Sequence, residues 1–564
     1  MRWTPDGVGD SAMGYRVAAD VVVAVHVACL GFVAAAPRAD RPAGPPVRAD
    51  RPAGPPGPRR PGPAYGGPIG NGGPMRVHAR LTAAAAAAVL ALGVVAAVEV
   101  IAPGRAGAVE TETYPLPAGG AWSIAGKGFG HGRGMSQWGS QGAALLGLSG
   151  LQILAFYYPG TAHTTVADAP IRVLISGDEG VDTAVGARPG LAFRDVASGL
   201  LYQLEAGPLR WRGVHDGLTM HVDSYDGATW SPWTAPDGRS TWAGPLRFGA
   251  GATETLTLYI GQAPTAYRGT ITAVPTGTTS VATVNTLAMD LYLRSVVPAE
   301  SPASWRPAAL RSQAVAARTY AAYGRARSTG AQWDTCDSTA CQVYRGVASE
   351  AASTTLAVQQ TANQIRTVGG APILAEFSAS NGGWTVAGGP AYQVAKPDPY
   401  DAAGGANPNS NWVAPVTADS LRARYPQLGT PTALRVVTRD GNGTWGGRIA
   451  DMWVDGTAGS VHLTGSGGAR LTLRSTWWIP RPTISGPALV PAGSTVTLTG
   501  TARAGATVEV WFHRRNVPGY TKRRSLVADV AGRWSTTYVA IDDFRYYAVS
   551  YGLRSDAGLT QIPH

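Results

Sequence analysis

The amino-acid sequence predicts an α+β, β-rich protein built of several domains. Residues 165–284 and 480–564 consist of short runs of alternating apolar and polar residues separated by Gly, Asp and Pro, the pattern of antiparallel strands. Between them, residues 285–479 contain an alanine-rich stretch with apolar residues at helical spacing. The 564 residues include 73 Gly and 42 Pro, which favours loops and strands, while 45% hydrophobic and 15% charged residues are typical of a folded chain.

The first 74 residues are expected to form a disordered extension. They are rich in Pro, Arg and Gly, and the repeated Arg-Ala-Asp-Arg-Pro-Ala-Gly-Pro-Pro segment at 38–46 and 48–56 cannot pack a core. Translation starting near Met75 would leave this extension outside the protein.

Residues 75–108 have the parts of a secretory signal. A basic start at 75–80 precedes an apolar run at 81–98 and a small-residue cleavage site at 106–108. We therefore expect a secreted or envelope-associated protein whose mature chain begins near Val109. An uncleaved membrane anchor formed by residues 81–98 is the alternative, because the run is just long enough to span a bilayer.

The net charge of +11 does not predict a nucleic-acid-binding protein. Residues 1–108 hold eleven Arg and six acidic residues, and residues 481–564 hold ten Lys or Arg and five acidic residues, so the region between them is nearly neutral. No basic stripe interleaved with aromatic residues crosses that central region.

The segment 109–164 is expected to form a binding loop followed by a helix. Glycine occupies positions 126, 128, 130, 132 and 134 around His131, which lets the backbone approach a ligand closely. A helix starting near Met135 would point its amide N–H groups and Ser136 into that turn. The competing interpretation is a structural histidine in a glycine turn. The spacing fits neither a phosphate loop nor a Gly-x-Ser-x-Gly elbow.

The β subdomain predicted at 165–284 contains tryptophans that admit two interpretations. Their rings could stack on sugars, or they could pack a hydrophobic core, which is the commoner use. These residues are Trp211, Trp230, Trp233 and Trp242.

Glu300 is the candidate catalytic residue. It lies between Pro298 and Pro302, so we expect a stiff loop that presents its carboxyl beside an apolar helix starting at Pro307 and stopping near Gly324. Desolvation there favours the protonated form, which a general acid requires. A capping or salt-bridging surface carboxylate is the alternative.

Cys336 and Cys341 stand five residues apart, while Cys29 lies in the part expected to be removed. In an oxidising compartment, a short disulfide loop is the favoured interpretation. A zinc site is the alternative, but no histidine stands between His221 and His462 to complete it nearby.

These motifs together resemble the SpoIID/LytB family. The segment Tyr292–Tyr320 is similar to the family's "YL-x-x-V-V-P-x-E … W-x-x-A-L-x-x-Q-A-V-A-A-R-T-Y" signature, although Ser301 stands where the family commonly has Met. Residues 130–139 resemble its "G-H-G-x-G-M-S-Q-x-G" block, which normally closes the domain and here opens it. The arrangement therefore looks permuted and requires residues 122–161 to fold back beside Glu300.

The resemblance extends over about residues 122–478 and implies a SpoIID-like α/β body at 285–479. Residues 480–564 resemble a bacterial immunoglobulin-like β-sandwich. Positive charge in this last domain is concentrated at 513–515 and 522–524, which suits an anionic wall polymer or simply a soluble surface.

The function implied by the resemblance is lytic transglycosylation of peptidoglycan, with Glu300 as the catalytic residue and no cofactor or metal. The alternative is a non-catalytic wall protein that enhances an N-acetylmuramoyl-L-alanine amidase. Expected partners are peptidoglycan glycan strands and, in the alternative, the amidase. Short polar side chains around a glycine pair at 382–383 would line the groove. The predicted substrate-binding residues are His131, Ser136, Gln137, Gln313, Arg318, Gln342, Tyr344, Ser378, Ser380, Asn381 and Thr385.

Overall fold

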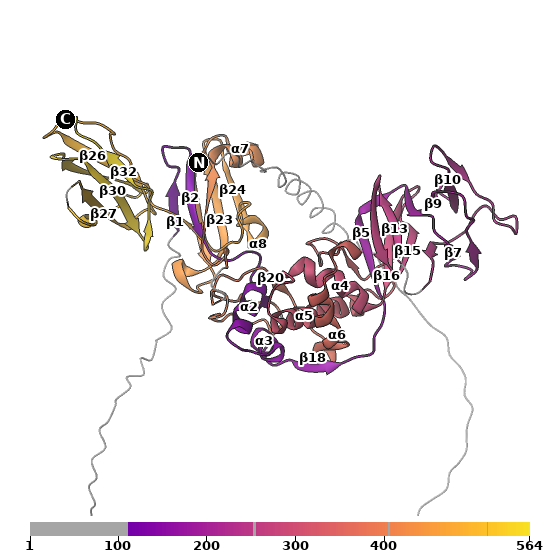
Figure 1. Cartoon of the computed structure of the whole chain (residues 1–564). Coiled ribbons are helices and arrows are strands. Elements are labelled where there is room, and N and C mark those ends of the chain that lie inside the picture. The colour runs from indigo at the N-terminus through magenta and orange to yellow at the C-terminus, as the bar shows by residue number, and fades with distance from the viewer. Residues whose placement is uncertain (1–110, 252–254, 404–406, 516, 564) are drawn as a thin grey trace, which may run out of the picture. The chain divides into compact units, whose positions relative to one another are not determined.

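The computed structural model describes residues 111–564 except 252–254, 404–406, 516 and 564 (Figure 1). Strands predominate and helices are few, which confirms the predicted α+β, β-rich class. The expected extension at 1–74 and the expected signal or anchor at 75–108 lie outside the described residues. Within the described part, no helix combines the length and apolarity needed to cross a membrane.

The helical layer is organised around α5 (Pro307–Arg327). Ala314, Ala317 and Ala321 are fully buried along it, and these small side chains let the neighbouring helices pack closely against it. Those helices are α2 (Gln137–Leu145), α3 (Gly150–Tyr157), α4 (Met289–Glu300) and α6 (Ala352–Gln360).

Two local predictions about this layer are wrong. Glu300 does not lie in a loop: it is the last residue of α4, which contains Pro298 in its final turn. Pro298 has no N–H and so removes one hydrogen bond from the helix. The helix still closes after it, because the Ser301 N–H donates to the Val297 carbonyl. Gly324 does not stop α5, which continues to Arg327, because a glycine lowers helix propensity without ending a packed helix.

The segment predicted as an antiparallel β subdomain folds into two sheets. One has the order β11-β10-β9-β6-β13-β14 and the other the order β17-β5-β16-β15-β12-β7-β8, with the short β17 as a parallel edge. Their strands are β5 (Ile171–Gly180), β6 (Asp182–Gly186), β7 (Ala192–Asp195), β8 (Leu201–Gln203), β9 (Arg210–His215), β10 (Met220–Tyr225), β11 (Trp230–Pro232), β12 (Leu246–Gly249), β13 (Thr255–Ile260), β14 (Ala263–Arg268), β15 (Thr270–Pro275), β16 (Val281–Leu287) and β17 (Thr335–Cys336).

The tryptophans of this subdomain mostly pack its core. Trp211, Trp233 and Trp242 are buried together, whereas Trp230 is partly exposed and lies 4.4 Å from the Arg212 guanidinium. The same core continues into buried residues of α4 and α5, so the β subdomain and the helical layer share one hydrophobic cluster.

A second core joins the start of the described chain to its later part. β2 (Ala121–Gly126) pairs with β21 (Trp412–Thr417) on one side and β25 (Trp478–Pro480) on the other. Trp122, Trp412 and Trp478 are buried in this cluster. A neighbouring antiparallel sheet contains β1 (Glu112–Pro115), β22 (Pro431–Arg439), β23 (Ile449–Gly456) and β24 (Ser460–Thr464).

The remaining short elements connect these layers. They are β3 (Met135–Ser136), β4 (Ala162–Thr165), η1 (Val347–Ser349), β18 (Gln364–Val368), β19 (Ala371–Pro372), β20 (Phe377–Ser378), α7 (Ala418–Arg424), η2 (Pro426–Leu428), η3 (Thr444–Gly446) and α8 (Gly465–Gly468).

The C-terminal residues form a separate β module with its own core. One sheet consists of β26 (Thr495–Thr501) and β29 (Arg533–Val539), and the other contains β27 (Thr507–Arg514), β28 (Thr521–Val527), β30 (Phe544–Ser550), β31 (Leu553–Arg554) and β32 (Gly558–Thr560). Val496 and Leu498 of the first sheet pack with Val510 and Phe512 of the second. Two antiparallel sheets enclosing one core are the arrangement expected of a β-sandwich.

Candidate functional site

The glycine-histidine segment folds back onto the body of the protein, as the permuted motif order predicts. β3 pairs in parallel with β20, and α2 packs against α5. The Gln137 side chain at the start of α2 donates a hydrogen bond from Nε2 to Oε2 of Glu300 at 3.0 Å, across 163 positions of sequence. Two motifs far apart in the sequence therefore meet at Glu300.

The Glu300 carboxyl is held on both oxygens. The backbone N–H of Val343 donates to Oε1 at 3.1 Å, opposite the Gln137 bond to Oε2. The side chain is partly exposed. Burial raises the pKa of Glu300 above its ordinary value, although the hydrogen bonds from Val343 and Gln137 and the charge of Arg345 oppose that rise. The pKa of Glu300 is raised overall, so its carboxyl keeps its proton to a higher pH than a solvent-exposed glutamate does.

Two partly exposed tryptophans are close in sequence to Gln137 and Glu300. Trp138 follows Gln137, and Trp305 belongs to the loop that follows Glu300. Their ring centroids are 5.1 Å apart in an edge-to-face arrangement. The backbone N–H of Arg306 also donates to Gln141 of α2 at 2.9 Å, which holds the loop against the helix. Partly exposed indoles offer apolar surface on which a sugar ring can stack.

The disulfide between Cys336 and Cys341 lies just before Val343, with a Cα–Cα distance of 5.4 Å. It closes a short loop that leads into the backbone N–H donor of Glu300. Among the described residues, no group of three or more His, Cys, Asp or Glu side chains is arranged to hold a metal ion. The cysteines therefore form the disulfide loop in this structure.

A buried carboxylate, Asp401, anchors the glycine-histidine segment to residues 380–382. It accepts hydrogen bonds from the Ser136 hydroxyl at 2.5 Å and from the Ser380 hydroxyl at 2.8 Å. The backbone N–H groups of Asn381 and Gly382 also donate to it, each at 3.1 Å. Because Ser136 is the N-cap of α2 as well, this network sets where α2 starts and hence where Gln137 points.

The glycines of the motif fit the protein backbone. At Gly134 (φ +64°), an added Cβ would lie 1.9 Å from the carbonyl oxygen of Glu376, and at Gly130 (φ +98°) it would lie 2.8 Å from Ser378 Cβ. Residues 376–380 therefore occupy the space that side chains would fill at Gly130 and Gly134. The prediction that the glycines make room for a ligand is not supported at these two positions.

Residues 277–367 match the family described as SpoIID, stage II sporulation protein. The chain contains a SpoIID domain. The match runs from the last strand of the β subdomain through Glu300, α5 and α6, and is narrower than the span of 122–478 over which the motifs resemble the family.

Two curated proteins are similar to part of the chain. The amidase enhancer of Bacillus subtilis (strain 168) is 35% identical over 147 residues, which cover 25% of this chain and 19% of that protein. An uncharacterized protein of Brachyspira hyodysenteriae is 35% identical over 132 residues, covering 23% of this chain and 36% of that protein. The chain thus spans well under half the length of either relative.

The solved structures that match do not bear on function. Two variants of superoxide reductase (neelaredoxin) from Ignicoccus hospitalis are 13% and 14% identical and align over 15% of this chain and 80% of theirs, each with a TM-score of 0.14.

Four predicted substrate-binding residues are buried within the SpoIID domain. Their side chains bond to other parts of the fold or face its interior, so they cannot contact a glycan directly, and those predictions are wrong. Arg318 forms an ion pair with Asp290 at 2.7 Å. Gln342 accepts from the Tyr292 hydroxyl and donates to the Ala317 carbonyl, and Tyr344 donates to Asn285 at 2.6 Å. Gln313 is buried with neither amide atom hydrogen-bonded.

Most of the polar residues predicted to line the groove are buried, and their side chains hydrogen-bond within the protein. Ser136, Ser380 and Asn381 are fully buried, and Thr385 is buried and donates to the Val394 carbonyl at 2.6 Å. The prediction that these four side chains contact substrate directly is therefore also wrong. Ser378 is buried as well, and its hydroxyl accepts from the Gly132 N–H at 3.3 Å. Sequence alone could not distinguish a groove from the network beneath it, since both use short polar side chains.

His131 is a partly exposed member of the predicted set. Its Nδ1 accepts from the Arg133 N–H at 3.0 Å. Burial and the neighbouring positive charge of Arg133 lower the pKa of His131 to about 4, so the ring is neutral near pH 7. It can exchange hydrogen bonds with a neutral ligand there but does not supply a positive charge.

The side chain of Glu376 was missed by sequence reasoning. It receives two hydrogen bonds from Arg133, at 2.9 and 2.7 Å, and a third from Gln393 at 2.9 Å. Burial alone would raise the pKa of Glu376, but the bonds and charge of Arg133 outweigh it and lower that pKa. Glu376 is thus a structural carboxylate with a lowered pKa, whereas the pKa of Glu300 is raised.

Sequence reasoning also missed other residues around Glu300 and in the hydrogen-bond network of Asp401. A backbone donor such as Val343 leaves no signal in a sequence. Trp138 occupies a variable position of the motif, and Asp401 ends the Asp398-Pro-Tyr-Asp401 run, for which the sequence predicts no role. Asp398 accepts from Tyr157 at 2.7 Å and from Asn381 at 2.6 Å, so both acids of that run are structural anchors.

Proposed function

We propose that this protein acts on the bacterial cell wall as a peptidoglycan lytic transglycosylase with Glu300 as its acid and base. The observation that carries the proposal is the Glu300 carboxyl itself, with its raised pKa, its partial exposure and its bonds from Gln137 and Val343. A positioned carboxyl that holds its proton near the working pH is what protonation of a sugar leaving group requires.

In the first step, Glu300 gives its proton to the glycosidic oxygen between N-acetylmuramic acid and N-acetylglucosamine. The bond from the muramyl C1 to that oxygen breaks, and positive charge develops at C1. The carboxylate left on Glu300 keeps the hydrogen bonds from Gln137 and Val343, which stabilise its new negative charge.

In the second step, the Glu300 carboxylate takes the proton of the muramyl 6-hydroxyl while that oxygen bonds to C1. The products are a 1,6-anhydro sugar and a new glycan end, and the enzyme recovers its proton. One carboxyl suffices because no water is activated, so a second catalytic carboxylate is not needed. Glu376, which is paired with Arg133, is kept outside this chemistry.

The decisive experiment digests purified sacculi with the protein and with its Glu300→Gln variant. The variant should fold, because its amide oxygen can still accept from Val343, and the Gln137 amide can rotate to present its oxygen to the new NH₂ group. Release of anhydro-muropeptides, followed by mass spectrometry, should be lost. Unchanged release would remove Glu300 from the mechanism, and reducing-end sugars in place of anhydro ends would indicate hydrolysis.

A second candidate function is supported by the relative named an amidase enhancer, which is 35% identical over 147 residues. In that role, the protein would bind the wall and stimulate an N-acetylmuramoyl-L-alanine amidase without cleaving glycan. Stimulation of an amidase that survives Glu300→Gln, with no sugar product, would favour it over the transglycosylase.

We further propose that the protein works outside the cytoplasm. The Cys336–Cys341 disulfide supports this location, because such bonds persist in oxidising compartments. Fractionation of cells followed by N-terminal sequencing of the protein would test export. The same measurement separates a signal cleaved before Val109 from a retained anchor at 81–98.

A further inference from the structure

The C-terminal sandwich carries an arginine at a position that should face its core. In β28, Arg524 lies directly across from Val510 of β27, and Leu526 lies across from Val508. Residues paired across an antiparallel ladder share a face of the sheet. Since Val508 and Val510 are buried in the core, Arg524 is on the inner face of this edge strand.

A β-bulge accompanies this arginine. The register shifts between Val510 and Trp511, because Val510 pairs with Arg524 whereas Trp511 pairs with Lys522, which leaves Arg523 as the extra residue. A bulge redirects side chains and increases local twist. Two adjacent arginines are thereby presented at one edge of the sandwich.

The inner face of the opposite sheet completes a cleft. Thr536 and Tyr538 of β29 pair with the buried Leu498 and Val496, so both side chains lie on the inner face and face β28. The space between the strands is a hollow of ≈ 390 Å³, a size that ligand sites commonly have. Its lining residues are Thr495, Phe512, Arg523, Arg524, Thr536, Thr537, Tyr538 and Val539.

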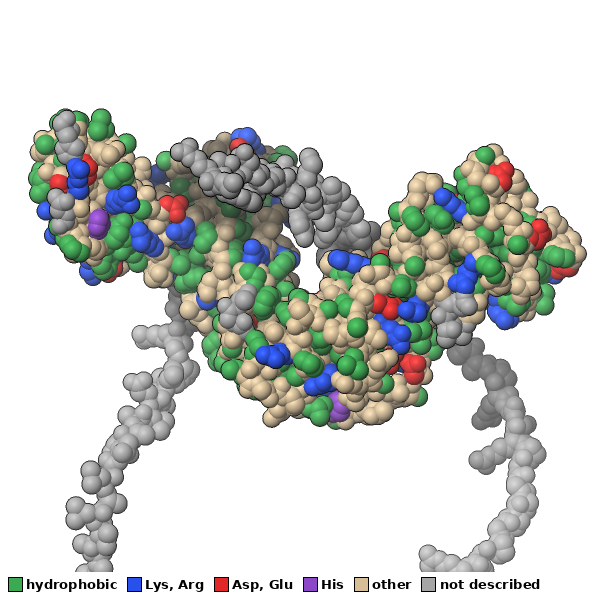
Figure 2. Space-filling view, in the orientation of Figure 1, with side chains coloured by type: hydrophobic (Ala, Val, Ile, Leu, Met, Phe, Trp, Pro, Cys, Tyr) green, Lys and Arg blue, Asp and Glu red, His purple; other side chains and the backbone are tan. Residues whose placement is uncertain are grey.

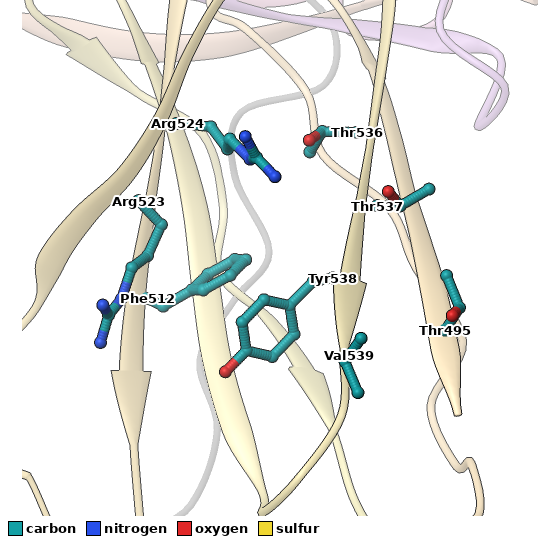
Figure 3. Close-up of a pocket in the computed structure, with 8 residues that line it drawn as sticks. All are labelled: Thr495, Phe512, Arg523, Arg524, Thr536, Thr537, Tyr538 and Val539. Atoms are coloured by element: carbon teal, nitrogen blue, oxygen red, sulfur yellow. The ribbon is translucent and has the colours of Figure 1, made fainter. Parts of the chain in front are cut away.

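The cleft is basic and aromatic. Figure 3 shows the Arg524 guanidinium pointing across the gap toward Thr536, with the rings of Phe512 and Tyr538 farther along it. Tyr538 is only partly buried, and its hydroxyl accepts a bond from Arg514 at 2.6 Å. On the face shown in Figure 2, this module displays more basic than acidic side chains.

The two arginines of the bulge differ from Lys522, the third basic residue of β28. Lys522 is paired with Glu509 at 2.9 Å. By contrast, Arg523 and Arg524 are exposed, and neither forms an ion pair or side-chain hydrogen bond with any residue in the described ranges. Their donors are available to a ligand.

We propose that the cleft between β28 and β29 binds an anionic polysaccharide. Arg524 pairs with a phosphate or carboxylate group of the polymer, because its planar guanidinium matches either group with two parallel hydrogen bonds. The Tyr538 ring offers a face to an adjoining sugar, and the Thr536 hydroxyl is available to its oxygens. This attachment is independent of Glu300 and would hold the chain on its polymer whether or not the transglycosylase proposal stands.

The competing explanation is protection of the sheet edge, since an inward-pointing charge on an edge strand blocks pairing with another chain. It predicts that removing the charge causes self-association and leaves polymer binding unchanged. The two explanations therefore differ in a measurable outcome.

The test uses the full chain and two variants that each lose one positive charge, Arg524→Gln in the cleft and Arg533→Gln outside it. Arg533 is exposed on β29 next to the inward Trp534, so its side chain is on the outer face. Affinity electrophoresis measures binding to phosphorylated dextran and to polygalacturonate. Neutral dextran and a short DNA duplex are the comparison polymers.

We expect Arg524→Gln to weaken binding to at least one anionic polysaccharide by about tenfold, which corresponds to about 1.4 kcal/mol. Arg533→Gln should change it less than about twofold, as expected of an exposed charge screened by salt. Preference for phosphorylated dextran would identify phosphate as the recognised group, and preference for polygalacturonate would identify carboxylate.

The proposal is overturned if the wild type binds neither anionic polysaccharide, binds DNA equally well, or loses equal affinity in both variants. Self-association of Arg524→Gln without loss of binding would assign the residue to edge protection. If Arg524→Gln does not fold, Arg524→Lys keeps the charge and loses the paired hydrogen bonds. It should still weaken binding several-fold, and unchanged affinity would overturn the proposal.

Discussion

The hydrogen bond from Gln137 to Glu300 makes a quantitative prediction. Gln137→Met replaces the side chain with one of similar length that cannot donate a hydrogen bond. Glu300 then loses one of the two donors that stabilise its charged form, while its burial and the Val343 N–H bond are unchanged. The pKa of Glu300, already raised by burial, should rise further.

The magnitude follows from the strength of the bond that is lost. A hydrogen bond to a charged group is worth about 1.5–3 kcal/mol. One pKa unit corresponds to about 1.36 kcal/mol, so the expected rise is about one to two pH units. Water can replace part of the lost donor because the carboxyl is partly exposed, which favours the lower end, a rise of about one pH unit.

The assay is the pH dependence of anhydro-muropeptide release. In the proposed mechanism, activity requires protonated Glu300 and falls as the pH rises through the pKa of Glu300. The alkaline limb of the profile should therefore move to higher pH in Gln137→Met. Gln141→Met is the matched control, since Gln141 lies one turn further along α2 and bonds to Arg306 instead. An alkaline limb that moves equally in both variants, or in neither, would show that the Gln137 bond does not tune Glu300.

Four further substitutions follow from the same contacts. Trp138→Ala should raise KM about tenfold with a smaller change in kcat, because an indole that covers a sugar ring buries apolar surface worth about 1.5–3 kcal/mol. Trp138→Phe should recover most of that loss. Asp401→Asn should lower the free energy of unfolding by about 3 kcal/mol in urea, because the new NH₂ group would face converging donors. Replacing both Cys336 and Cys341 by Ser should cost about 2 kcal/mol, the closure entropy of so short a loop, and unchanged stability would refute that entropic account. Burial raises the pKa of Glu300, so the folded state holds that proton more tightly than the unfolded state does. Wild-type stability should therefore fall as the pH rises above the ordinary pKa of a glutamate. Glu300→Gln should lack that fall in thermal melts measured from pH 4 to 9.

Local patterns predicted the elements of the fold more reliably than their ends. Alanine at helical spacing predicted α5, and period-two runs predicted the strands of the β subdomain and of the C-terminal module. The ends were set by contacts that those patterns do not contain. The helix α4 runs through Pro298 to Glu300, and α5 runs past Gly324, because each is packed against neighbouring elements along its length.

The roles of the polar motif residues were the least predictable part of the site. Ser136, Ser380 and Asn381 have side chains suited to binding a sugar, but all three are buried around Asp401 or its neighbour Asp398. Hydroxyl and amide groups serve equally well in a groove or beneath it. Only their exposure distinguishes the two, and exposure depends on which other segments cover them.

The sequence by itself determined that a carboxyl at position 300 precedes an alanine-rich helix, and that the glycine-histidine motif had to return to it. The first depends on short-range spacing, and the second on the order of the motifs that resemble the SpoIID/LytB family. The tertiary structure alone decided what surrounds that carboxyl. Its donors come from residues 163 and 43 positions away, and one of them is a backbone N–H. Burial and hydrogen bonding act through space, so the ionisation of Glu300 is a property of the folded chain.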